Sequence, residues 1–71
     1  MQKQIEKLKK VRDKALELIE RRDKAALIRS DEWYNSEKGK NHETATATLA
    51  DATETINDAI KELEIYLKHT K

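Results

Sequence analysis

The sequence predicts an all-α protein, folded as an antiparallel two-helix hairpin that packs like a coiled coil. The 71 residues include no proline and one glycine, the two residues least suited to helix interiors. Charged residues make up 41% of the chain and hydrophobic residues 37%, a composition typical of long helices and coiled coils. Apolar residues recur at three- and four-residue steps, which is the helical period. A chain this short forms at most one domain, so we expect a single one over 1–71.

The first expected helix covers about residues 3–38. Gly39 marks its end, because glycine suits the position just past a helix C-terminus and the basic Lys38 suits the last turn. A competing interpretation breaks this helix near Ser30-Asp31, since either residue can cap a new helix. We favour one continuous helix. Its periodic apolar positions are Ile5, Leu8, Val11, Ala15, Leu18, Ile19, Ala25, Ala26 and Trp33.

The second expected helix covers about residues 42–69. It follows a turn at 39–41, in which Asn41 is a suitable N-cap. Apolar residues then alternate four- and three-residue steps without interruption, which is the pattern of a heptad seam. The seam positions are Ala45, Leu49, Ala52, Ile56, Ala59, Leu63 and Tyr66.

The short turn also predicts how the two helices pair. Helices joined by two or three residues run antiparallel and side by side. Folding the chain about Gly39 places Trp33 opposite Ala45, and Ile19 opposite Ile60. A large ring against small side chains provides the complementarity that a packed seam needs.

The first helix carries more apolar surface than one partner helix covers. Beside the wing that faces the second helix, a further wing consists of Ile5, Leu16, Leu27 and Tyr34. Left in water, these residues would form an exposed patch of the kind that marks an interaction surface. Burying each large aliphatic side chain is worth about 1.5–3 kcal/mol. We therefore predict a homodimer that forms a four-helix bundle, or a higher cyclic oligomer.

Charge is distributed unevenly along the chain. Residues 1–30 hold ten basic and five acidic residues, whereas 31–71 hold five basic and nine acidic residues, an asymmetry that favours pairing between the halves. Acidic neighbours dilute the basic stripe and no aromatic residue interleaves it, so we do not expect nucleic-acid binding. The basic stripe consists of Lys3, Lys7, Lys10, Lys14, Arg21 and Lys24, and the acidic stripe of Asp51, Glu54, Asp58 and Glu62.

Arg22 and Arg29 fall on the apolar side of the first helix, where a charge needs a partner or access to water. In the simpler interpretation their aliphatic stems cover apolar surface while their charged ends reach water. In the alternative, two arginines one heptad apart grip a carboxylate or phosphate. The candidate binding residues are thus Arg22, Arg29, Tyr34, Leu16 and Leu27, with Tyr34 as an interface anchor.

Catalytic and metal chemistry are not expected. The chain has no cysteine, and His42 and His69 lie at opposite ends of one expected helix, so they cannot share a metal within a chain. Neither a nucleophile motif nor a phosphate-binding loop occurs, and we predict a non-enzyme without cofactors. No apolar run approaches the roughly 18 residues that span a bilayer, and the N-terminal stretch is polar. We expect a cytoplasmic location.

Two resemblances bear on function. The segment 31–39 followed by a Thr-rich heptad helix resembles small helical proteins encoded by bacteriophages. Five further residues look like the helix of phage sponge proteins that sequester cyclic oligonucleotides and block host defence signalling, although Thr55 stands where that family has an aromatic residue. No binding residues are carried over from that family. The five residues are Leu49, Ala52, Asn57, Ala59 and Ile60.

These resemblances imply a phage-type protein that acts by binding. Our leading hypothesis is a binding protein that engages an unidentified host protein through a helical surface, in an inhibitory or anti-defence role. One alternative is an oligomeric sponge for an anionic or cyclic nucleotide, with Arg22 and Arg29 lining a cleft between subunits. The other alternative is a purely structural assembly module.

Overall fold

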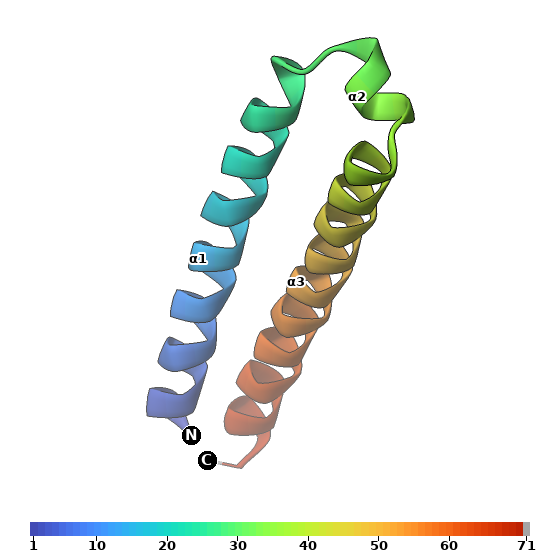
Figure 1. The fold of residues 1–71 in the computed structure, drawn as a ribbon. Coiled ribbons are helices and arrows are strands. Elements are labelled where there is room, and N and C mark those ends of the chain that lie inside the picture. The colour runs from blue at the N-terminus through green and yellow to red at the C-terminus, as the bar shows by residue number, and fades with distance from the viewer. Residues whose placement is uncertain (71) are drawn as a thin grey trace.

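The computed structural model describes residues 1–70 and consists of three helices. They are α1 (Gln2–Leu27), α2 (Asp31–Asn35) and α3 (Glu37–His69). The two long helices, α1 and α3, pack side by side with the chain termini at one end, and the short α2 forms the corner at the other (Figure 1). The molecule is a rod of 57 × 14 × 12 Å. The predicted all-helical class is confirmed.

The prediction of one continuous helix over 3–38 is wrong. The first helix ends at Leu27, and α2 begins after Ser30, whose hydroxyl accepts a hydrogen bond from the Trp33 amide at 3.3 Å. The competing interpretation, a break at Ser30-Asp31, is correct. A serine side chain that satisfies a free amide of a new helix competes with continuation of the old one.

The predicted turn at 39–41 is also wrong, because Gly39 and Asn41 both lie inside α3. The N-cap of α3 is Ser36, whose hydroxyl accepts from the Gly39 amide at 3.2 Å and donates to the Trp33 carbonyl. Gly39 is buried and its φ is not positive, so it is not a helix-ending glycine. A Cβ there would overlap the Trp33 carbonyl oxygen and lie 2.9 Å from the Cα of Tyr34. Close approach of α2 is the reason for glycine.

The seam between α1 and α3 is a heptad pattern that includes polar residues. Arg12 donates to the Asn57 side chain at 3.1 Å, and Arg22 donates to the Thr46 hydroxyl at 2.8 Å. Only Ile5 and Ile60, at 2% and 1% exposure, are fully buried apolar side chains among residues 1–70. The seam positions, buried or half-buried, are Ile5, Leu8, Arg12, Ala15, Ile19, Arg22 and Ala26 on α1, and His42, Thr46, Leu49, Thr53, Ile56, Ile60, Leu63 and Leu67 on α3.

The corner at 28–36 shifts the pairing of the helices from the predicted register. Ile19 was predicted to lie opposite Ile60, but it lines a hollow together with Thr46 and Ala50. The pairing of α1 with α3 is therefore displaced by nearly three helical turns. Trp33 lies in the corner, with its ring 5.3 Å from the ring of His42, rather than opposite Ala45. The predicted register failed because it was measured from a turn placed too late in the chain.

The described residues contain neither a membrane-spanning helix nor a cluster of metal ligands. Over residues 1–70, no helix combines the length and apolarity that crossing a bilayer requires. Within the same residues, no three histidine or acidic side chains gather closely enough to hold a metal ion.

Candidate interaction surface

A hairpin of two helices has two open edges, and the heptad phase assigns residues to each. Each heptad contributes two seam positions, which alternate along the helix. In an antiparallel pair, the residues directly after one of these positions line one edge, and the residues directly before the other position line the opposite edge. We call the first the leucine edge, formed by Leu16, Leu27, Tyr34, Ala47 and Ala50. We call the second the alanine edge, formed by Val11, Leu18, Ala25, Ala45, Ala52, Ala59 and Tyr66.

The leucine edge contains shallow hollows between α1 and α3. Leu27 is 80% exposed and Leu16 is 50% exposed. A hollow of about 380 Å³ lies beside Leu16, and one of about 560 Å³ lies beside Leu27 and Tyr34. Of the four residues in the predicted apolar wing, the structure thus leaves Leu16 and Leu27 exposed. The other residues around the larger hollow are Ile19, Asp23, Ala26, His42, Glu43, Thr46, Ala47 and Ala50.

Tyr34 has a different place from the one predicted. It is half-buried, and its hydroxyl donates a hydrogen bond to the carbonyl of Ala26, in the last turn of α1. Its ring meets Trp33 edge-on, with 5.2 Å between ring centroids. Tyr34 therefore ties α2 to the end of α1, and it borders the larger hollow as part of the corner.

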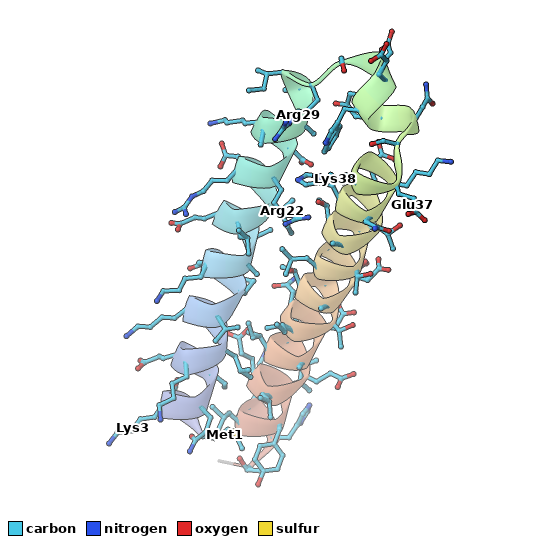
Figure 2. The ribbon with its side chains drawn as sticks, in the orientation of Figure 1. Met1, Lys3, Arg22, Arg29, Glu37 and Lys38 are labelled. Carbon is cyan, nitrogen blue, oxygen red and sulfur yellow. The ribbon has the colours of Figure 1, made fainter. Side chains whose placement is uncertain are left out.

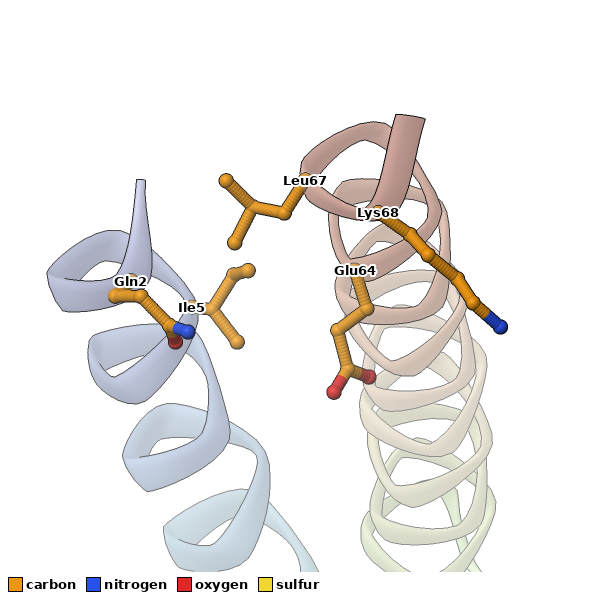
Figure 3. A pocket seen from close by; sticks show the side chains of 5 residues that line it. All are labelled: Gln2, Ile5, Glu64, Leu67 and Lys68. Carbon is orange, nitrogen blue, oxygen red and sulfur yellow. The ribbon is translucent and has the colours of Figure 1, made fainter. Parts of the chain in front are cut away.

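Ile5 was predicted for the exposed wing and is instead a core residue. At the open end of the hairpin, Ile5 and Leu67 point toward each other across the seam (Figure 3). A third hollow of about 360 Å³ lies at this end, and Gln2, Glu64 and Lys68 complete its wall. The observed seam of α1 contains Ile5 and Leu8. The predicted seam was traced through Leu8 and Val11, and it left Ile5 on the exposed wing.

Arg22 and Arg29 have separate partners. The Arg22 side chain points toward α3 (Figure 2), where its Nη2 also donates to the His42 carbonyl at 3.2 Å, in addition to the bond with Thr46. Arg29 lies over the ring of Trp33, with its guanidinium carbon 5.2 Å from the ring centroid. This contact is a cation–π interaction. The two guanidinium groups thus stabilise different parts of the hairpin instead of facing one common ligand.

The two charged stripes lie on exposed surface of the hairpin, and one member, Glu54, borders the hollow beside Leu16. All ten of their residues are exposed, and Lys3 points away from the hairpin (Figure 2). Among residues 1–70 one ion pair joins the long helices, between Lys9 and Glu64 at 3.5 Å, and neither residue belongs to a stripe. Lys24 pairs with Glu20 on its own helix at 3.3 Å. Within one chain the basic and acidic stripes therefore do not neutralise each other.

The alanine edge was not recognised as a separate surface in the sequence. Val11 and Leu18 were assigned to the helix contact but are 51% and 44% exposed, and Tyr66 is 54% exposed. Ala45 and Ala52, assigned to the seam of the second helix, are exposed as well. The signal that reveals this edge is a strict seven-residue spacing on both helices. Those series are Val11, Leu18, Ala25 and Ala45, Ala52, Ala59, Tyr66.

No family model, curated protein or solved structure matches this chain. Two apolar edges and two charged outer faces are the features available for recognition.

Proposed function

We propose that this chain is a non-enzymatic binding protein that engages a protein partner through the leucine edge. The observation that carries this proposal is Leu27, which is 80% exposed beside an apolar-lined hollow of about 560 Å³. A soluble helical hairpin gains nothing from a leucine in water, whereas an aliphatic side chain at an interface is worth about 1.5–3 kcal/mol when it is buried. Contiguous exposed apolar patches mark protein interaction sites, and Leu27, Ala47 and Ala50 border this hollow together.

The shape of the leucine edge favours a helical segment as the ligand. The hollows beside Leu16 and Leu27 lie along the junction of α1 and α3, so an amphipathic helix laid there would make contact at successive turns. Asp23 and Glu43 border the larger hollow and favour a partner with basic residues at its rim. The resemblance to phage proteins suggests a host protein in the cytoplasm as this partner and an inhibitory or anti-defence role.

The chain also exposes more surface than a compact monomer, which supports self-association. Its accessible surface is 5,899 Å², whereas a compact monomer of 8.3 kDa exposes about 4,600 Å² by the scaling of surface with mass. The excess, roughly 1,300 Å², exceeds the approximately 800 Å² per partner of a standard interface. We therefore include homo-oligomerisation in the proposed function.

A pull-down from host lysate tests the leucine edge. The bait is the wild-type chain, and the test variant is Leu27→Glu, which places a charge in the proposed contact. The matched control is Ile65→Glu, because Ile65 is 55% exposed on a different face of the molecule. We expect a specific protein to be retained by the wild type and by Ile65→Glu and lost with Leu27→Glu. Retention of the same proteins by all three baits would refute the proposal.

The nucleotide sponge is the weaker candidate. Arg22 already donates to Thr46 and His42, and Asp23 and Glu43 border the adjacent hollow, which disfavours an anion there. A thermal-shift screen with cyclic nucleotides distinguishes the two ideas, because a ligand that binds only the folded form raises the melting temperature. We expect no shift. A rise that disappears in Arg29→Ala would favour the sponge over protein binding.

A further inference from the structure

We propose that the alanine edge is a dimer interface, which binds the alanine edge of a second copy of this chain with both corners at the same end. This inference deepens the self-association in the proposed function by naming its surface and its symmetry. In this arrangement the two-fold axis runs parallel to the helices. Helix α1 of each copy then packs on α3 of the other, and neighbouring helices of the four-helix bundle are antiparallel throughout.

The first support is the register of apolar residues across the edge. The hydrogen bonds from Arg12 to Asn57 and from Arg22 to Thr46 fix which residues of α1 and α3 lie at the same level. At that register three pairs of residues on the edge lie at the same level. The pairs are Val11 with Ala59, Leu18 with Ala52, and Ala25 with Ala45. The alanine edge is thus a ladder of apolar layers that spans most of the rod.

The second support is size complementarity within these layers. Turning a second hairpin about the long axis places its α3 over α1 at the same level, so Leu18 meets Ala52 of the second copy. In the next layer Val11 meets Ala59 of the second copy. Large residues on one helix and small residues on the other allow two backbones to approach closely, which a row of large residues on both would prevent. The edge is self-complementary, as a two-fold interface requires.

Charge selects the symmetry of the dimer. The basic residues Lys7, Lys14 and Arg21 lie on the outer face of α1 beside the alanine edge, and all are exposed. With both corners at one end, they lie next to α3 of the second copy, where Lys7 is level with Glu62. Lys14 then lies level with Thr55 and Arg21 with Thr48, about one turn from Asp58 and Asp51, whereas Glu54 borders the leucine edge. With the corners at opposite ends, α1 would meet α1 and basic residues would face one another, which costs free energy.

The leucine edge is the less suitable surface for this contact. Asp23 and Glu43 border its larger hollow, and a second copy placed there would bring these carboxylates together or bury them. The charged residues of α1 beside the alanine edge are the basic Lys7, Lys14 and Arg21, which lie on the outer face and can reach water. A dimer through the alanine edge also leaves the hollows beside Leu16 and Leu27 facing outward in both copies, so binding of a partner remains compatible with it.

The chain offers a matched pair of residues for testing the interface. Leu16 and Leu18 are neighbours on α1 and are 50% and 44% exposed, but they lie on opposite edges. We expect the wild type to have twice the 8.3 kDa chain mass in light scattering or sedimentation equilibrium. Leu18→Glu should raise the dissociation constant of the dimer at least tenfold, whereas Leu16→Glu should leave this constant unchanged. Weakening by Leu16→Glu that equals or exceeds that by Leu18→Glu would overturn the assignment of the edge.

Further outcomes separate this inference from the rest of the proposed function. A monomeric wild type would overturn both self-association and this interface, and a mass above twice the chain would overturn the closed dimer. Either result leaves partner binding at Leu27 to its own test. If Leu18→Glu loses helicity in circular dichroism, Ala52→Glu tests the same edge from α3. A helical Ala52→Glu that dimerises as the wild type does would overturn the interface.

Spin labels distinguish the two symmetries. The chain has no cysteine, so Asn35→Cys provides one labelling site, in the exposed corner. With both corners at one end, we expect a label-to-label distance below about half of the 57 Å long axis, because only the thickness of the bundle separates the labels. A distance close to the full 57 Å length would overturn the proposed arrangement while leaving the alanine edge as the interface.

Discussion

Replacement of Gly39 by alanine is the sharpest test of the corner between α2 and α3. The added Cβ would overlap the Trp33 carbonyl oxygen, and it would lie 2.8 Å from the carbonyl carbon and 2.9 Å from the Tyr34 Cα. These are backbone atoms, so no side-chain rotation relieves the overlap. Either α2 moves away, which breaks the hydrogen bond from Ser36 to the Trp33 carbonyl, or the first turn of α3 unwinds, which breaks the Ser36 cap.

The expected magnitude of Gly39→Ala follows from two opposed contributions. Overpacking costs about 1–3 kcal/mol, and contact with backbone places this case at the upper end. Alanine gains about 1 kcal/mol over glycine in a helix interior. The net loss is then about 1–2 kcal/mol, which lowers the melting temperature of a domain this small by roughly 4–16 °C. Thermal unfolding followed by circular dichroism at one fixed protein concentration measures this change.

The control is Lys40→Ala, an exposed position in the same turn of α3 that gains helix propensity without a clash. It should be neutral or slightly stabilising, within about 0.5 kcal/mol. If Gly39→Ala is as stable as Lys40→Ala, the close approach of α2 to α3 does not exist in solution. Gly39 would then not be required by contact with α2.

Three further substitutions test the seam and the caps. Arg22→Ala should lower the free energy of unfolding in urea by about 1.5–3 kcal/mol, because it removes charged donors to Thr46 and His42. Arg21→Ala, at the exposed neighbouring position, should change it by less than about 0.5 kcal/mol. Equal effects of the two substitutions would show that Arg22 does not stabilise the seam. Ser36→Ala should cost about 1 kcal/mol through the lost cap of α3, and faster amide hydrogen exchange in residues 37–40 would locate the loss. Ile60→Ala should cost about 2–5 kcal/mol because Ile60 is 1% exposed, and a cost no larger than that of Ile65→Ala would contradict the proposed core.

Composition and periodicity were sufficient for the all-helical class, whereas the hairpin was predicted from a turn at 39–41 that lies inside α3. The lack of proline and the apolar residues repeating at the helical period both favoured helices along the chain. Leu49, Ile56 and Leu63 were correctly placed in the seam. Leu16 and Leu27 were correctly expected to have no cover from the second helix.

The position of the corner was not decided by local signals. Ser30 and Gly39 were both plausible helix boundaries, and the chain uses the serine as a cap while it buries the glycine against α2. Local capping signals have similar strength at several sites, typically about 1 kcal/mol each. The contact of α2 with the first turn of α3 selects between them, and that contact joins residues through space.

Sequence alone determined that the chain forms amphipathic helices with apolar surface to spare, because helical period and side-chain character are local properties. Only the tertiary structure decided which apolar residues meet across the seam. The register fixed by Arg12 with Asn57 and by Arg22 with Thr46 depends on where the chain turns. That register buries Ile5 and Ile60 and leaves Val11, Leu18 and Tyr66 in solvent, since a helix can present one stripe to its neighbour at a time.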